Sequence, residues 1–193
     1  MGIVLAGGRS LRFGASDKLS AEYRGMPLLH HAILRLAEVC PRVVVVAGFG
    51  TPDPALPPGV QVSVVHDATA DQGPLAGLLA GLGGSAGAEL AIVAGGDMPD
   101  LRVPVLLEML KVAGEAPADA VALNDAAGMR PLPCVLRLGR AAEATHALLR
   151  AREGSLRALL RAVRTAAIDE ETWTALDAGR RTLFDVDAPA DLE

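Results

Sequence analysis

Short runs of apolar residues alternate along the chain with longer segments whose apolar residues recur every three or four positions. The short runs suit buried parallel strands, and the longer segments have the spacing of helices that pack on one face. The pattern predicts strands over residues 2–6, 42–48, 60–67, 89–97, 118–125, 131–138 and 164–169. It predicts helices over residues 27–40, 73–84, 103–114 and 141–163, with Gly114 closing the third helix and a turn at Gly128 between two strands.

This regular alternation is typical of α/β proteins, in which a mostly parallel, doubly wound sheet lies between two layers of helices. A length of 193 residues without a linker or an internal repeat fits a single domain over residues 1–193. Such sheets bind ligands outside the carboxyl ends of their strands, where the strand order reverses. The candidate functional residues are therefore those that follow four of the strands: Gly7-Gly8, Gly48, His66-Asp67 and Gly95-Gly96-Asp97.

Composition narrows the class of protein. Although 51% of the residues are hydrophobic, no run approaches the ~20 apolar residues of a membrane span, and no charged leader precedes the first strand. We therefore expect a soluble, cytoplasmic protein without membrane contact. Cys40 and Cys134 are isolated in apolar settings, which predicts buried free thiols. A net charge of −5, with three Phe, one Tyr and one Trp, argues against nucleic acid as the main partner.

The loop after the first strand, "AGGRSLRFGASDK", combines glycines with cationic side chains. It lacks the Gly-Lys-Ser/Thr of a Walker loop and the G-x-G-x-x-G of a dinucleotide-binding loop. Glycines at a strand end let the backbone approach a ligand closely, and Arg9, Arg12 and Lys18 can donate charge-assisted hydrogen bonds to phosphate oxygens. The loop thus favours a polyphosphate ligand, with a solvated surface turn as the alternative.

The same loop matches the nucleotidyltransferase signature L-A-x-G-x-x-x-R-(M/F)-x-x-x-x-K through Leu5 to Gly8, Ser10, Arg12, Gly14, Asp17 and Lys18, with Phe13 where Met is usual. Its "LAGGxSxRMGxDK" form resembles the molybdenum cofactor guanylyltransferase family. The resemblance continues in order through "GMPLLHHAILRL", "GPLAGLLAGL", "GGDMPDL" and "DVDAPADL", and so spans nearly the whole chain.

The resemblance implies a Rossmann-like, three-layer nucleotidyltransferase domain that uses Mg²⁺ and holds GTP on the first loop. The nucleotide-binding residues that it implies are Leu5, Ala6, Gly7, Gly8, Arg12, Lys18, Asp67 and Asp97. The loop backbone would read the guanine, Arg12 and Lys18 would hold the triphosphate, Asp67 would lie near the ribose or base, and Asp97 would bind Mg²⁺. A carboxylate behind two glycines also suits a hard cation on chemical grounds, and a helix N-cap is the alternative for Asp97.

The implied reaction transfers GMP from GTP to the terminal phosphate of molybdopterin and releases pyrophosphate. That phosphate has a second pKa near ~6 and needs little help from a general base. None of the histidines stands out as such a base, and His66 is interpreted as structural. Catalysis would rest on positioning and on charge neutralisation by Arg12, Lys18 and the Mg²⁺ at Asp97.

Two further segments are implied on the acceptor side. The first is Gly73, Pro74, Leu75, Ala76 and Gly77, which would open toward the pterin; packing of small residues against the sheet is the alternative. The second is the tail, where Asp185 and Asp187 replace the two Asn of better-known members. Either Asp would be a second Mg²⁺ ligand, or Asp187 would cap a final helix that begins at Pro189. Gly48 also stands where those members have an Asn that contacts the nucleotide.

Three alternative functions remain open at this stage. A cytidylyltransferase for the same pterin, or a nucleotidyltransferase for another phosphorylated acceptor, would use the same loop. A catalytically silent nucleotide-binding scaffold is the alternative from another class. Apart from GTP and the pterin, the expected partners are other cofactor-biosynthesis proteins or acceptor enzymes, and the expected state is a monomer or weak oligomer.

Overall fold

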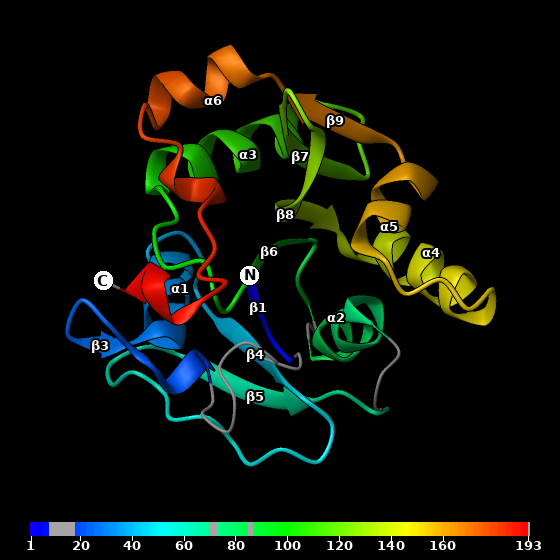
Figure 1. The fold of residues 1–193 in the computed structure, drawn as a ribbon. Coiled ribbons are helices and arrows are strands. Elements are labelled where there is room, and N and C mark those ends of the chain that lie inside the picture. Colours follow the sequence, from blue (N-terminus) through cyan, green and yellow to red (C-terminus); the bar gives the residue numbers. More distant parts are fainter. Residues whose placement is uncertain (8–17, 70–72, 85–86, 193) are drawn as a thin grey trace.

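A seven-stranded sheet forms the middle layer of the fold (Figure 1). The computed structural model describes residues 1–7, 18–69, 73–84 and 87–192. In spatial order the strands are β5 (Val62–His66), β4 (Val43–Ala47), β1 (Gly2–Ala6), β6 (Leu90–Gly95), β8 (Gly128–Arg137), β7 (Ala120–Asp125) and β9 (Thr165–Ile168). The neighbours of β8 are antiparallel to it and the other four pairs are parallel, which confirms the predicted, mostly parallel sheet.

Helices cover both faces of this sheet (Figure 1). One face carries α1 (Leu28–Ala37), α3 (Val103–Glu115) and α6 (Glu170–Leu176), and the other carries α2 (Pro74–Gly83), α4 (Leu138–Arg150) and α5 (Leu156–Ala162). Each face buries its own apolar core, because the side chains of a strand alternate between the two faces. None of the helices in the described ranges is long and apolar enough to cross a membrane.

Strand β1 lies in the middle of the sheet because its residues are apolar on both faces. Ile3 and Val4 are fully buried, one in each core. The strand pairs with β4 on one side and β6 on the other, so the strand order reverses between β1 and β6. This reversal places the carboxyl ends of β1 and β6 beside each other, at the edge where ligands are expected. Cys40 and Cys134 are buried free thiols, as predicted.

All four predicted helices have different limits in the structure, and the first ends at Ala37 instead of Cys40. The helix expected over residues 141–163 is two helices, because Arg152 adopts a left-handed conformation (φ 61°) and Ser155 caps α5 by accepting a hydrogen bond from the N–H of Ala158 at 3.3 Å. Gly114 lies inside α3 instead of closing it, and the helix ends at Glu115, with the extended residue Ala116 as its C-cap. A Pro follows Ala116, and the residue before Pro is pushed out of the helical region.

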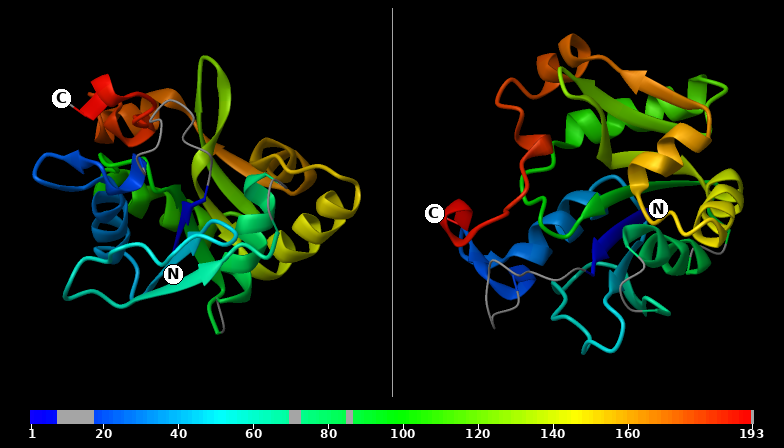
Figure 2. Two further views of the ribbon diagram at one scale, coloured as in Figure 1. Left: turned by 60° about the horizontal axis from the view of Figure 1, so that its bottom comes forward. Right: turned by 45° about the vertical axis from the view of Figure 1, so that its right-hand side comes forward.

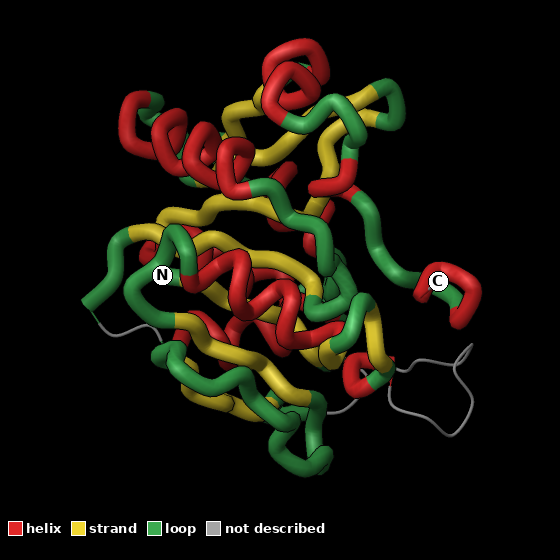
Figure 3. Tube along the Cα trace, turned by 90° about the vertical axis from the view of Figure 1, so that its left-hand side faces the viewer, coloured by secondary structure: helices red, strands yellow, loops and turns green. Residues whose placement is uncertain are grey.

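Several short elements were not predicted. A hairpin joins β2 (Glu22–Tyr23) to β3 (Met26–Pro27), and its turn needs positive φ at Arg24 and Gly25. Within the described residues, 3₁₀ helices also cover Lys18–Ser20 and Arg181–Leu183, and α6 precedes the second of them. A further 3₁₀ helix, Pro189–Leu192, begins at the residue where a final helix was considered. Figure 2 shows the tail, in orange and red, running from α6 back to the blue hairpin β2–β3, and Figure 3 shows it as a loop that ends in a short helix.

Candidate active site at the carboxyl edge of the sheet

A backbone hydrogen bond links the carboxyl ends of β1 and β6 at the point where the strand order reverses. The N–H of Gly96 donates to the carbonyl of Leu5 at 2.9 Å, directly after the last residue of β6. Leu5 and Ala6 are half-buried, and Gly7 is exposed at this edge. The other predicted residues of this loop, Gly8, Arg9 and Arg12, lie outside the described residues.

Lys18 and Asp97 meet at this edge although they are far apart in the sequence. The Nζ of Lys18 donates to Oδ2 of Asp97 at 2.8 Å. The Lys18 side chain is 11% exposed and that of Asp97 33% exposed, so the ion pair is only partly shielded from water. The structure therefore brings together two of the three predicted catalytic residues, and the role of each stays a prediction.

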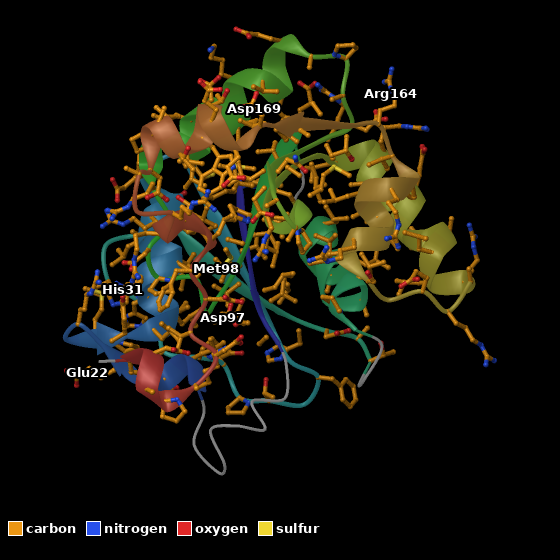
Figure 4. The ribbon with its side chains drawn as sticks, turned by 45° about the horizontal axis from the view of Figure 1, so that its top comes forward. Glu22, His31, Asp97, Met98, Arg164 and Asp169 are labelled. Atoms are coloured by element: carbon orange, nitrogen blue, oxygen red, sulfur yellow. The ribbon has the colours of Figure 1, made fainter. Side chains whose placement is uncertain are left out.

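The tail adds two carboxylates to this pair. Residues 184–187, which we call the strap, are fixed by the N–H of the fully buried Val186, which donates to the backbone carbonyl of Asp97 at 2.9 Å. Asp97 is labelled in Figure 4. Oδ1 of Asp187 lies 3.9 Å from the Nζ of Lys18. Desolvation, followed by the negative charges of Asp187 and Asp97, raises the pKa of Asp185. Asp97, Asp185 and Asp187 thus form one acidic cluster around Lys18.

The capping roles considered for two of these aspartates do not match the structure. Arg102 is the residue that precedes the first turn of α3, so Asp97 is not the N-cap of that helix. At the tail, the carboxylate of Asp191 accepts hydrogen bonds from the N–H groups of Asp187 and Ala188 at 2.9 and 2.8 Å. This is the reverse of the capping considered for Asp187, whose own carboxylate lies toward Lys18.

The surroundings of Asp97 fit a single-carboxylate Mg²⁺ site. A Cβ at Gly95 would lie 2.4 Å from Oδ1 of Asp97, so this carboxylate needs the space that glycine leaves. Among the described residues the cluster holds three carboxylates and one ammonium group, a set that favours a cation. Within the described residues no group of three or more His, Cys, Asp or Glu side chains could hold a metal ion. Mg²⁺ commonly takes one or two protein carboxylates and fills its other positions with phosphates and waters.

A second group of predicted residues lies at the ends of β4 and β5. A Cβ at Gly7 would be 3.4 Å from the Cα of Gly48, so the loops after β1 and β4 approach closely. Asp67, directly after β5, accepts a hydrogen bond from the N–H of Thr69 at 3.1 Å, and its Oδ2 would lie 3.7 Å from a Cβ at Gly77. Asp67 therefore lies between the carboxyl edge of the sheet and the first turn of α2.

His66 is held by its neighbours in the same region. Its Nε2 lies 2.7 Å from Oδ1 of Asp53, and its Nδ1 lies 3.3 Å from the carbonyl of Gly48. These two hydrogen bonds raise the pKa of the exposed His66 ring. The contacts fasten the loop between β4 and β5, in keeping with a structural interpretation of this residue.

The start of α2 is packed against the loop that joins α4 to α5. Gly73 has a positive φ (78°), and a Cβ there would lie 2.9 Å from the carbonyl oxygen of Gly154. The same carbonyl accepts the N–H of Leu75 at 3.2 Å, and the N–H of Ala76 donates to Gly73. Gly73 and Pro74 are exposed, whereas residues 75–77 are buried. Packing therefore accounts for the inner part of this segment, and only its outer part is open to a ligand.

Sequence reasoning missed a buried polar cluster beside the site. Asp100, which is 9% exposed, bonds Tyr23, Arg24 and Arg181. The only sequence signal was the second aspartate of "GGDMPDL", for which no role was expected. Its partners could not be inferred, because they lie 76 to 81 residues away along the chain.

Comparison with known proteins agrees with this geometry. Residues 2–169 match the family model described as the MobA-like NTP transferase domain. The chain is 30% identical to a probable molybdenum cofactor guanylyltransferase of Natronomonas pharaonis, covering 100% of this chain and 94% of that protein. It is 34% identical to a molybdenum cofactor guanylyltransferase of Cereibacter sphaeroides, covering 92% and 90%.

Solved structures show the same fold. Molybdopterin-guanine dinucleotide biosynthesis protein A from Archaeoglobus fulgidus superposes with a TM-score of 0.75 at 21% identity, covering 100% of this chain and 95% of that chain. The 2-C-methyl-D-erythritol 4-phosphate cytidylyltransferase from Thermus thermophilus gives a TM-score of 0.70 at 15% identity, covering 98% and 94%. The Rossmann-like nucleotidyltransferase fold expected from the sequence is therefore confirmed.

Proposed function

Because the chain belongs to the MobA-like NTP transferase family, we propose that it transfers GMP from GTP to the terminal phosphate of a molybdopterin-type acceptor. The observation that carries the proposal is the Lys18–Asp97 pair at the carboxyl edge between β1 and β6. The pair supports the proposal because it sets a cation and a carboxylate at the switch point where sheets of this topology bind their ligands, and these groups suit a triphosphate and its Mg²⁺. The relatives, which are molybdenum cofactor guanylyltransferases by name, suggest the identity of the nucleotide and the acceptor.

In the proposed reaction an oxygen of the acceptor phosphate attacks the α-phosphorus of GTP. A new P–O bond forms, the bond between the α- and β-phosphates breaks, and pyrophosphate leaves with the bonding electrons. The attacking phosphate is already largely ionised near neutral pH, because its second pKa is about 6. The chain therefore needs to orient the two substrates and neutralise charge, which is the main demand of phosphoryl transfer.

Lys18 and Asp97 would divide this work. Asp97 would hold Mg²⁺, which when bound supplies positive charge to the triphosphate oxygens. Lys18 would then turn its ammonium group from Asp97 to the phosphates, so the 2.8 Å ion pair keeps both groups in place until the nucleotide binds. Arg12 of the first loop is the further cation assigned to the triphosphate.

The remaining predicted residues divide between the two substrates. Leu5, Ala6, Gly7 and Asp67 are assigned to the nucleotide, on the side of β4 and β5. The exposed start of α2 at Gly73 and Pro74, together with Asp185 and Asp187 of the strap, is assigned to the acceptor side.

Nucleotide-dependent thermal unfolding tests the proposal. GTP with Mg²⁺ should raise the melting temperature more than CTP or ATP at equal concentration. Release of pyrophosphate with GTP and a molybdopterin acceptor should follow. A larger shift with CTP would replace the guanylyl assignment with cytidylyl transfer, and nucleotide binding without pyrophosphate release would make the protein a nucleotide-binding scaffold.

A further inference from the structure

Asp100 lies three residues after Asp97 and is a buried carboxylate at the centre of a cluster of charged and polar side chains. Its Oδ2 accepts a hydrogen bond from the hydroxyl of Tyr23 at 3.0 Å and from Nε of Arg181 at 2.8 Å, with a further contact to Nη2 of Arg181. Its Oδ1 accepts a hydrogen bond from Nη1 of Arg24 at 3.0 Å. Nη2 of Arg181 also donates to the Tyr23 hydroxyl at 3.1 Å, which closes the cluster.

These contacts join three segments that lead into the candidate site. Tyr23 belongs to the hairpin that follows Lys18, and Asp100 belongs to the loop that carries Asp97. Arg181 begins the 3₁₀ helix that leads into the strap, four residues before Asp185. Arg181 also lies beyond residues 2–169, so the family model does not extend to this segment.

Asp100 and Arg181 each stabilise the charged form of the other. Burial alone would raise the pKa of Asp100, but the hydrogen bonds from Arg181 and Tyr23 and the charges of Arg181 and Arg24 outweigh burial and lower it. The bond to Asp100 raises the pKa of Arg181, and burial followed by the same carboxylate raises that of Tyr23. Nε and Nη2 of the planar Arg181 guanidinium both point at one oxygen, Oδ2 of Asp100, and this fixes the direction of the Arg181 side chain relative to that carboxylate.

We propose that Asp100 is a positioning residue, which holds the strap and the Lys18 segment in register with Asp97. Without it, Arg181 loses the carboxylate that it docks on, and the strap loses this link to the loop that carries Asp97, while the backbone bond of Val186 to Asp97 and the apolar packing of Phe184 and Val186 remain. The structural part of this inference stands alone, and its consequence for catalysis rests on the function proposed above.

Loss of Asp100 would loosen the strap alone, because separate hydrogen bonds hold the start of the tail. Oγ1 of Thr182 accepts the N–H of Arg102 at 3.2 Å, and Asp177 accepts the N–H of Thr182 at 2.7 Å. These bonds hold the tail to the start of α3 independently of Asp100. The effect of losing Asp100 is therefore expected at residues 184–187.

Amide hydrogen exchange in the Asp100→Asn variant tests this positioning role. The loss of charge-assisted bonds should speed exchange at Val186 by about 10- to 100-fold, whereas Val93 in the middle of β6 should exchange at the wild-type rate. kcat/KM for the acceptor should fall about tenfold or more, because misplaced charges weaken transition-state stabilisation. Arg181→Lys, which keeps the charge but loses the planar contact, should show the same pattern to a smaller degree.

The matched control is Asp119→Asn. Asp119 is also buried, with 7% of its side chain exposed against 9% for Asp100, and it also pairs with an arginine, Arg164. It precedes β7 and so lies at the opposite, amino-terminal edge of the sheet. This variant should leave Val186 exchange and kcat/KM unchanged.

Several outcomes would overturn the proposal. Unchanged exchange at Val186 in Asp100→Asn would show that the strap does not depend on this residue. Faster exchange without a loss of kcat/KM would show that the strap does not serve catalysis. Equal acceleration at Val186 and Val93 in both Asp100→Asn and Arg181→Lys would mean that the cluster only stabilises the fold. If the wild-type protein does not use GTP, the proposed function fails, while the exchange data still decide whether Asp100 holds the strap.

Discussion

Substituting Lys18 and substituting Asp97 should lower the free energy of unfolding by different amounts, although the two residues form one ion pair. Exposed pairs contribute about 0.2–1 kcal/mol, and removing one partner of a buried pair costs about 3–5 kcal/mol. With Lys18 11% exposed and Asp97 33% exposed, this pair falls between those limits. We expect Asp97→Asn to lower the free energy of unfolding by only about 1 kcal/mol, because it also relieves repulsion with Asp185 and Asp187.

Lys18→Met should cost more, because it removes the ammonium group that pairs with Asp97 and leaves that carboxylate beside those of Asp185 and Asp187. We expect a loss of about 2–3 kcal/mol. In a protein of this length each kcal/mol corresponds to about 2–4 °C in melting temperature, so the shifts should be about 2–4 °C for Asp97→Asn and about 4–12 °C for Lys18→Met.

Urea unfolding of the two single variants and the double variant measures the coupling between the residues. The double variant should be less destabilised than the sum of the two singles, by about 1 kcal/mol or more. Equal costs for the two single variants, or a coupling within error of zero, would refute the view that Lys18 balances an acidic cluster. In the proposed reaction Asp97→Asn should also lower kcat about 100-fold or more, and a variant that stays active would place the metal elsewhere.

Three further predictions concern other parts of the edge. Arg12→Ala should lower kcat/KM about 30- to 1,000-fold, whereas Arg9→Ala should lower it about tenfold or less. If steady-state kinetics show equal losses that depend on salt, the loop is a diffuse basic patch. Gly73→Ala should destabilise the protein by about 1–3 kcal/mol in thermal unfolding, because alanine is strained at its φ of 78° and its Cβ would meet a backbone carbonyl; a neutral variant would contradict the close packing of α2. The pKa of His66 is raised, so its pairing with Asp53 stabilises the fold fully below the unfolded pKa of 6.5, and this stabilisation is lost as pH rises through the folded pKa. Melting temperatures of wild type and His66→Gln between about pH 5 and 9 test this, and an unchanged profile in the variant would contradict it.

The central strands could be predicted from the sequence because their patterns are unambiguous. Four consecutive valines in β4 and the apolar β1 leave no reasonable alternative to buried strands, and glycines mark where both end. The place of the site followed from the same reasoning, because an α/β sheet with glycines and aspartates at its strand ends has one binding edge. Hence Lys18 and Asp97 could be assigned to one site before their contact was known.

The parts that were missed depend on single backbone conformations or on distant partners. A helical pattern runs through residues 141–163, and nothing in its periodicity reveals the left-handed Arg152 that divides it. The docking of Val186 on Asp97, and of Arg181 on Asp100, joins residues more than 80 positions apart. Local patterns carry no information about such contacts, which arise only when the whole sheet is assembled.

The antiparallel position of β8 has a consequence for how the chain is made. Strand β6 ends at Gly95, but the strand that pairs with its free edge, β8, ends at Arg137. At a synthesis rate of about 5–20 residues per second, the 42 residues between them take about 2–8 s. During that time the apolar β6 presents unpaired backbone groups, which can pair with the strands of other chains. The nascent chain therefore exposes an apolar strand edge during this interval that the finished fold covers, and faster translation of residues 96–137 should raise the soluble yield.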